Sequence, residues 1–132
     1  INKTLKLNAQ GILAIDDDII SIKLLELILS DNLYISSITT ASDGLEAMEI
    51  LERRFDINLI LLDIYMPRLN GFEFLHNFKS RKYLQDIPII VISTDATLRQ
   101  RTMELGVLAF LVKPISKKTL GKLIKQVANN SS

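Results

Sequence analysis

The sequence feature that most constrains the fold is a short apolar run, Leu59-Ile60-Leu61-Leu62, which ends on Asp63. An unbroken run of this kind is typical of a strand with both faces buried, as in parallel sheets covered by helices. Pro67 and the pair Asn70-Gly71 then predict a turn after the aspartate. The sequence therefore predicts that Asp63 lies at the carboxyl end of a buried strand, where open α/β sheets bind their ligands.

Strand-like and helix-like segments alternate five times along the chain. The predicted strands cover residues 11–15, 34–40, 58–63, 89–93 and 107–112. The predicted helices cover 19–29, a segment capped by Asp43 with Glu46 three residues later, 71–80, 96–105 and 116–127. Gly106 is expected to end the fourth helix and Ser116 to cap the fifth. Five such units predict a single α/β domain with a parallel sheet between two layers of helices.

Size and composition exclude several classes of protein. A chain of 132 residues with 48% apolar and 23% charged residues fits one globular domain. A net charge of +1 gives no field that would favour nucleic acid or an anionic membrane. The chain contains no cysteine, which excludes disulfides and thiolate sites and suits the cytoplasm. No apolar stretch approaches the roughly 18 residues that span a bilayer, so we expect no membrane segment.

Polar side chains follow four of the five predicted strands: Asp16 and Asp17, Asp63, Ser93, and Lys113. The ends of parallel strands share one edge of the sheet, so these groups are expected to meet. Carboxylates ~5 Å apart repel by roughly 3 kcal/mol per pair at an effective dielectric of ~20, which a divalent cation relieves. Oxygen ligands without His or Cys indicate Mg²⁺ or a similar ion. The metal and the lysine together could stabilise a phosphoryl group on a carboxylate nucleophile.

Each of these residues also has an ordinary interpretation. Asp18, the third aspartate of its run, is expected mainly to cap the first helix. Asp63 alone could be a turn residue, and Lys113 before Pro114 could be a solvated lysine ahead of a turn. The coincidence of all four groups at successive strand ends favours a site.

Four segments carry a resemblance to a known family: Ile12–Asp18, Leu61–Gly71, Pro88–Ser93 and Phe110–Pro114. They resemble the receiver domain of two-component response regulators, a flavodoxin-like group that includes the chemotaxis response regulator, over about residues 8–128. The resemblance implies a three-layer (βα)5 fold with a five-stranded parallel sheet in the order 2-1-3-4-5. It implies a receiver domain over 5–129, with loose termini at 1–4 and 130–132.

The resemblance also implies residue roles. Asp63 would be the phosphoacceptor, taking a phosphoryl group from a histidine kinase or phosphotransfer protein. Asp17 and Asp63 would ligate Mg²⁺ directly, Asp16 would act through water, and the Tyr65 backbone carbonyl would complete the protein ligands. Lys113 matches the family's lysine, whose peptide bond to proline is often cis.

Ser93 and Phe110 match the hydroxyl and aromatic switch positions of the family. Phosphorylation would draw Ser93 toward the phosphoryl group and let Phe110 fill the vacated space, shifting a pre-existing equilibrium. Because Phe110 has no hydroxyl to bury unpaired, it is expected to point inward more readily than a tyrosine. The output surface would be the fourth helix, fifth strand and fifth helix, where a downstream protein or a second copy could bind.

Two residues depart from the family pattern beside the phosphoacceptor. Thr94 stands where a small residue is usual, and Tyr65 lies two residues after Asp63. We expect both to shield the acyl phosphate from water and lengthen its lifetime. Asp95 argues against this, because its carboxylate could orient a water molecule.

Other features limit the functional interpretation. His76, the only histidine, falls in a predicted helix away from the strand ends, so the kinase histidine must come from another molecule. A group of lysines without acids is expected to be a solvated helix face or, alternatively, a surface for an acidic partner: Lys113, Lys117, Lys118, Lys122 and Lys125. Direct nucleic-acid binding is not expected.

The expected function is a cytoplasmic phosphoacceptor switch that promotes its own phosphorylation and dephosphorylation, and not an enzyme in the conventional sense. The main alternative is a pseudo-receiver, a protein-interaction module that keeps the fold without the chemistry. The acidic pair together with Asp63 and Lys113 argues against that alternative. A haloacid-dehalogenase-type hydrolase would need an aspartate at the position of Tyr65. A flavin carrier would need a phosphate loop where the aspartates stand.

Overall fold

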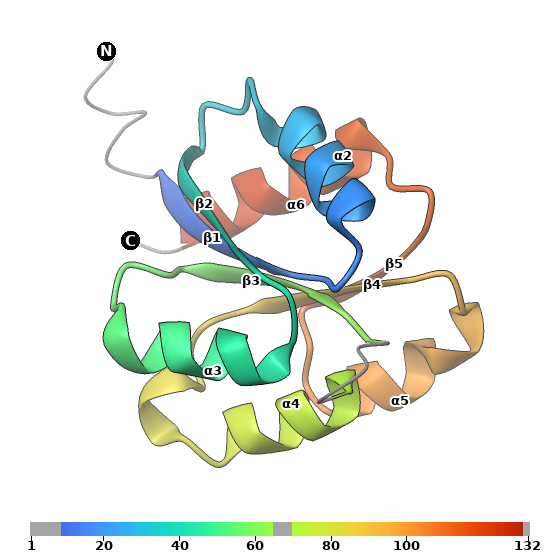
Figure 1. The fold of residues 1–132 in the computed structure, drawn as a ribbon. Coiled ribbons are helices and arrows are strands. Elements are labelled where there is room, and N and C mark those ends of the chain that lie inside the picture. The colour runs from blue at the N-terminus through green and yellow to red at the C-terminus, as the bar shows by residue number, and fades with distance from the viewer. Residues whose placement is uncertain (1–8, 65–69, 131–132) are drawn as a thin grey trace.

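The computed structural model describes residues 9–64 and 70–130. Within them, five parallel strands form one sheet in the order β2-β1-β3-β4-β5 (Figure 1). This confirms both the α/β fold and the strand order. None of the described helices is long and apolar enough to cross a membrane.

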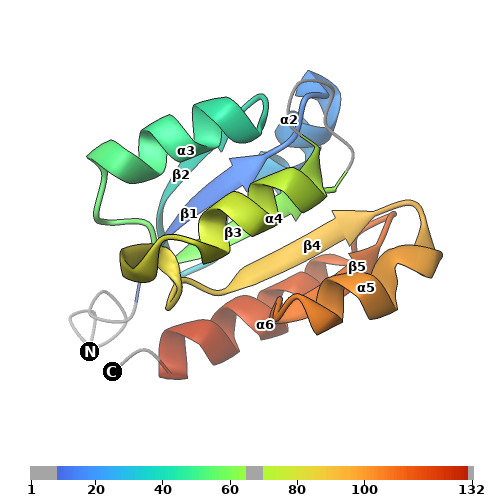
Figure 2. The ribbon, with the colours of Figure 1, turned by 90° about the horizontal axis from the view of Figure 1, so that it is seen from below.

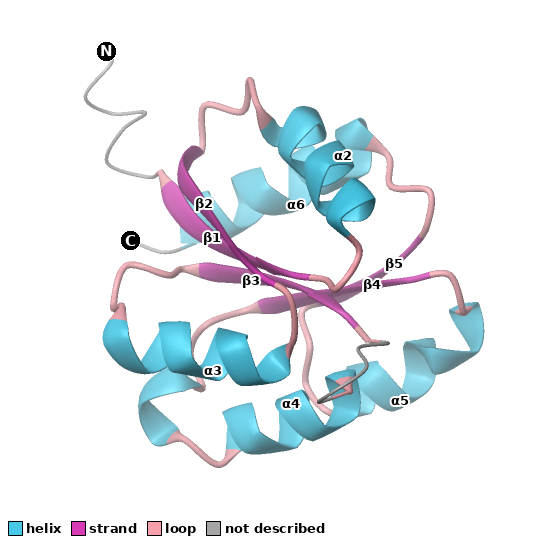
Figure 3. Cartoon of the chain, viewed as in Figure 1, coloured by secondary structure: helices cyan, strands magenta, loops and turns pink. Residues whose placement is uncertain are grey.

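The strands and helices alternate along the chain, as Figure 3 shows by colour. The strands are β1 (Gln10–Ile15), β2 (Ile35–Ala41), β3 (Leu59–Asp63), β4 (Ile89–Ser93) and β5 (Ala109–Val112). The helices are α2 (Ile19–Leu29), α3 (Gly44–Arg53), α4 (Gly71–Lys79), α5 (Arg99–Glu104) and α6 (Lys117–Asn130). Two 3₁₀ turns accompany them, η1 (Lys82–Leu84) and η2 (Ala96–Leu98).

The helices form two layers. In Figure 1, α2 and α6 lie on one side of the sheet, and α3, α4 and α5 lie on the other. Seen from below in Figure 2, α4 lies in front of the sheet. The central strand β3 is therefore covered on both faces, which is why its sequence is apolar without alternation.

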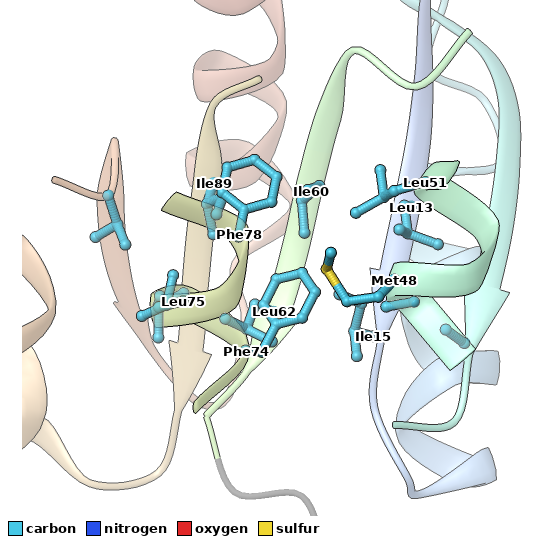
Figure 4. Packing of buried hydrophobic residues seen from close by; sticks show 14 of the residues in the cluster. Leu13, Ile15, Met48, Leu51, Ile60, Leu62, Phe74, Leu75, Phe78 and Ile89 are labelled. Atoms are coloured by element: carbon cyan, nitrogen blue, oxygen red, sulfur yellow. The ribbon is translucent and has the colours of Figure 1, made fainter. Parts of the chain in front are cut away.

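Successive side chains of β3 divide between two hydrophobic cores. Leu59 and Leu61 pack into the core beneath α2 and α6, whereas Ile60 and Leu62 pack into the core beneath α3 and α4. Figure 4 shows the second core, where Phe74 and Phe78 of α4 lie near Ile60 and Leu62. This packing fixes the direction and depth of the strand that ends on Asp63.

Side-chain caps begin the helices where the sequence predicts them. The Asp43 carboxylate accepts a hydrogen bond from the Glu46 N–H at 2.9 Å. Glu46 in turn accepts from the N–H of Ser42, one residue before the cap, at 2.6 Å. The Ser116 hydroxyl oxygen accepts from the Thr119 N–H at 3.2 Å, which confirms the cap of the last helix.

Several element boundaries differ from the prediction. The fourth helix opens as the 3₁₀ turn η2, because the Leu98 N–H donates to the Asp95 carbonyl three residues back at 3.3 Å. The last helix runs to Asn130 instead of Val127, since Val127 and Ala128 are both buried. Strand β5 begins two residues late, after Gly106 at φ +87°, because the Val107 N–H bonds to the end of α5.

Candidate functional site

The register of the sheet brings the predicted site residues to one edge. Ile15 pairs with Leu62, so the residues that follow β1 come beside Asp63, the last residue of β3. Ser93 ends β4 and pairs with Val112. The Lys113 N–H donates to the Ser93 carbonyl at 2.9 Å, which holds the lysine backbone against the end of β4. The sheet thus places all four strand ends around one site.

Three carboxylates gather at this edge. Oxygen atoms of Asp16, Asp17 and Asp63 all lie within 4.8 Å of one another. The side chains of Asp16 and Asp63 are 12% and 13% exposed, whereas Asp17 is exposed. Like charges this close, two of them largely removed from water, repel one another, and a bound cation would relieve the repulsion. The all-oxygen donor set fits a hard divalent ion such as Mg²⁺.

Lys113 faces the carboxylates from the end of β5. Its Nζ lies 3.7 Å from Asp16 Oδ2 and 3.9 Å from Asp63 Oδ2. Charge-assisted hydrogen bonds are about 2.7–2.9 Å long, so these are longer-range ion pairs. The ammonium therefore balances part of the negative charge without closing onto either carboxylate. The Lys113–Pro114 peptide bond is cis, the form that the family resemblance suggests.

Asp18 takes the structural role that the sequence predicts. Its carboxylate accepts from the Ile20 N–H at 3.0 Å and from the Ser21 hydroxyl at 3.0 Å. These hydrogen bonds, the one from Ile20 first, hold the pKa of Asp18 below its usual value. The Asp18 N–H also donates to Asp16 Oδ1 at 3.0 Å, so the cap helps to orient a member of the carboxylate cluster.

The predicted hydroxyl residue, Ser93, ends β4, and the predicted access residues follow it. Ser93 is buried, and its Oγ accepts from the Asp95 N–H at 3.1 Å. Asp95 Oδ1 in turn accepts from both the N–H and the hydroxyl of Thr97, so this oxygen already has local partners. Thr94 is exposed at the rim of the site. Tyr65, including its carbonyl, lies outside the described residues.

The aromatic switch candidate lies inside the molecule. Phe110 is 4% exposed and belongs to the core beneath α3 and α4. The inward placement agrees with the expectation for an aromatic ring without a hydroxyl. His76, in contrast, is exposed on α4, away from the strand ends.

Sequence reasoning missed an apolar pocket beside the carboxylates. The pocket measures about 430 Å³ and lies between α2 and the segment that follows β5. Asp63, Thr94 and Lys113 reach its wall, but most of its lining is apolar: Leu24, Leu25, Ile28, Ile92 and Ile115 are among these residues. The available signal was the composition of residues 19–29, which holds more apolar side chains than one buried helix face needs.

Comparison with known proteins gives one consistent result. Residues 12–125 match the family described as the response regulator receiver domain. The two-component response regulator ORR3 of Oryza sativa subsp. indica is 30% identical over 118 residues, covering 88% of this chain and 88% of that relative.

Solved structures agree with the sequence matches. The chemotaxis protein CheY4 of Vibrio cholerae superposes with a TM-score of 0.78 at 29% identity, covering 90% of this chain and 98% of that one. The phosphorylated cyanobacterial phytochrome response regulator RcpA gives a TM-score of 0.75 at 27% identity, covering 90% and 91%. Because the family model covers residues 12–125 and the fold agrees with that of solved response regulators, the chain belongs to the response regulator receiver domain family.

Proposed function

We propose that this receiver domain is a phosphoacceptor switch of a two-component phosphorelay, with Asp63 as the residue that carries the phosphoryl group. The observation that carries the proposal is the cluster of Asp16, Asp17 and Asp63 within 4.8 Å, with Lys113 Nζ 3.9 Å from Asp63. A nucleophilic carboxylate, a cation site and a fixed ammonium are the groups that phosphoryl transfer requires.

The donor is a phosphohistidine on a histidine kinase or phosphotransfer protein. An Asp63 oxygen attacks phosphorus, the bond from phosphorus to the imidazole nitrogen breaks, and the imidazole leaves with the electron pair. Asp17 and Asp63 would hold Mg²⁺ directly, Asp16 through water, and the Tyr65 carbonyl would be the remaining protein ligand. The ion supplies positive charge to the phosphoryl oxygens.

Side chains around Asp63 would bind the phosphoryl group and control the access of water to it. Lys113 lies near enough to Asp63 to pair with a phosphoryl oxygen once the carboxylate is phosphorylated. The Ser93 hydroxyl can donate a hydrogen bond to the phosphoryl group while its oxygen accepts from Asp95. Thr94 at the rim, together with Tyr65, limits the approach of water and prolongs the acyl phosphate. Comparing dephosphorylation of the parent with Thr94→Ala and Tyr65→Asn tests this; slower or unchanged decay in both variants refutes it.

An exposed apolar face beside the site supports a protein donor. Ile20, Leu24 and Leu27 of α2 are 68%, 55% and 69% exposed, and their spacing places them on one side of the helix. Leu24 also lines the apolar pocket that Asp63 reaches. A helix of the donor laid over this face would bury these side chains and present its histidine to Asp63.

The output would pass through α5, β5 and α6, the surface next to Ser93 and Phe110. A downstream protein or a second copy of the chain would bind there when Asp63 is phosphorylated. The cytoplasmic location expected from the sequence and the domain limits of 5–129 stay predictions.

Intact mass spectrometry tests the proposal against the pseudo-receiver alternative. The chain is incubated with acetyl phosphate and Mg²⁺, beside Asp63→Asn as the matched variant. We expect the parent to gain the mass of one HPO₃ group and the variant to gain none. No adduct on the parent with acetyl phosphate, phosphoramidate or a phosphorylated donor protein would favour the interaction module instead.

A further inference from the structure

We propose that Arg99 is a positioning residue of the switch, which clamps Phe110 in its inward orientation. One guanidinium reaches two parts of the same residue. Arg99 Nη1 donates to the Phe110 carbonyl at 3.2 Å, and its Cζ lies 5.2 Å from the centroid of the Phe110 ring. The hydrogen bond holds the β5 backbone, and the ring contact holds the side chain.

The exposure of the two residues indicates how the clamp works. Phe110 is 4% exposed, whereas Arg99, whose Cζ lies 5.2 Å from the ring centroid, is exposed, so a surface arginine contacts a buried ring. An outward turn of the ring would break the cation–π contact and bring the ring past the guanidinium. A planar guanidinium can stack on a ring and still donate from its edge, which an ammonium cannot do as well. The identity of the residue as arginine therefore matters.

The position of Arg99 in the chain connects the clamp to Ser93. The Ser93 oxygen accepts from the Asp95 N–H, Asp95 caps η2, and η2 leads directly into Arg99, the first residue of α5. A short segment thus carries the hydroxyl at one end and the guanidinium at the other. A movement of Ser93 toward a phosphoryl group would alter its hydrogen bond to Asp95 and so the start of η2. Arg99 would meanwhile hold the Phe110 ring in the space that Ser93 leaves.

The same helix provides a matched control. Arg101 Cζ lies 3.6 Å from the centroid of the Phe72 ring. This is the same kind of contact, but it joins α5 to α4 and involves neither Ser93 nor Phe110. Removing Arg101 therefore costs a cation–π contact without touching the clamp.

Fluorine NMR of protein labelled with 4-fluorophenylalanine tests the clamp itself. The chain has five phenylalanines, and Phe110→Leu identifies the resonance of interest. In Arg99→Ala we expect the outward population of Phe110 to rise about fivefold, which corresponds to about 1 kcal/mol for an exposed cation–π contact with its hydrogen bond. The resonance should move toward that of Phe55, which is 84% exposed, or broaden by exchange.

The other variants make the result specific. Arg99→Lys keeps the positive charge but not the planar guanidinium. Its outward population of Phe110 should therefore lie between those of the parent and Arg99→Ala. Arg101→Ala should move the Phe72 resonance and leave Phe110 in place. A Phe110 resonance that is the same in the parent, Arg99→Ala and Arg99→Lys overturns the clamp, as does an equal shift in Arg101→Ala. If Arg99→Ala fails to fold, the comparison of the Phe110 resonance in the parent and in Arg99→Lys decides whether the clamp exists.

The effect on the site rests on the proposed function and is measured separately. We expect acetyl phosphate to phosphorylate Arg99→Ala several-fold more slowly than the parent and Arg101→Ala at the parent's rate. Equal rates in all three proteins would overturn the link between the clamp and Asp63. If the parent takes no phosphoryl group at all, the proposed function fails, while the fluorine measurement still decides whether Arg99 positions Phe110.

Discussion

Replacing Asp63 by asparagine should stabilise the protein in the absence of Mg²⁺, although the substitution removes an ion pair. The sign of this effect depends on how the charges around Asp63 balance. Asparagine has nearly the same shape as aspartate, so the change in the free energy of unfolding reports mainly the electrostatic energy. The prediction therefore tests whether the carboxylate cluster is strained without its cation.

The distances give the expected magnitude. At an effective dielectric of about 20, Asp16 repels Asp63 by about 3.5 kcal/mol if their oxygens are 4.8 Å apart, and by more if they are closer. Lys113 Nζ, 3.9 Å away, attracts Asp63 by about 4 kcal/mol on the same basis. The lysine therefore cancels one neighbouring carboxylate but not two. Asp17 is exposed, and solvent screening reduces its repulsion of Asp63 to about 1 kcal/mol.

Urea unfolding measures the balance. In EDTA at low salt, Asp63→Asn should be more stable than the parent by roughly 0.3 to 1 kcal/mol, the larger value applying if the Asp16 and Asp63 oxygens lie about 4 Å apart. The gain should shrink at high salt. Mg²⁺ at about twenty times its Kd should stabilise the parent by about 2 kcal/mol, because the ion binds only the folded state, and stabilise the variant less.

A matched control variant should change the free energy of unfolding in the opposite direction. Asp31 pairs with Lys117 at 2.9 Å and has no place in the carboxylate cluster, so Asp31→Asn should lose a little stability and respond weakly to Mg²⁺. The electrostatic reasoning is refuted if Asp63→Asn is less stable than the parent in EDTA, because the attraction of Lys113 would then outweigh the repulsion of both aspartates.

Four further substitutions test other parts of the structure. A Cβ on Gly71 would lie 2.5 Å from the Ile64 Cα, so Gly71→Ala should lower the free energy of unfolding by about 1–3 kcal/mol and slow phosphorylation of the adjoining aspartate. Gly121→Ala, with no atom nearer than 4.0 Å, should be neutral or stabilising in the same urea titration. Thr94→Ala should hasten decay of the acyl phosphate, followed by loss of the phosphoryl mass with time. The lowered pKa of Asp18 means that its cap is fully stabilising above its ordinary value of 3.8 and is lost as pH falls through the lowered value. The stability difference between the parent and Asp18→Ala should therefore shrink on acidification below pH 3.8, and a constant difference down to pH 2 would contradict this.

The sequence by itself determined the fold class and the location of the site. Apolar runs and helical spacing are local patterns, and the ends of parallel strands must share one edge of a sheet. For that reason the sequence alone predicts that Asp63, Ser93 and Lys113 lie together. Capping is equally local, so Asp18 and Ser116 were also predictable.

Contacts between distant elements could not be read in this way. Arg99 and Phe110 are joined by a hydrogen bond and a ring contact. No sequence pattern predicts this contact, because it depends on how α5 packs beside β5. The extension of α6 to Asn130 likewise depends on the burial of Val127 and Ala128. The distances of 3.7 Å and 3.9 Å from Lys113 Nζ to Asp16 and Asp63 are likewise not encoded in any local pattern. Sequence patterns set which groups reach the edge of the sheet, whereas tertiary packing decided how closely they meet and which of them hold one another in place.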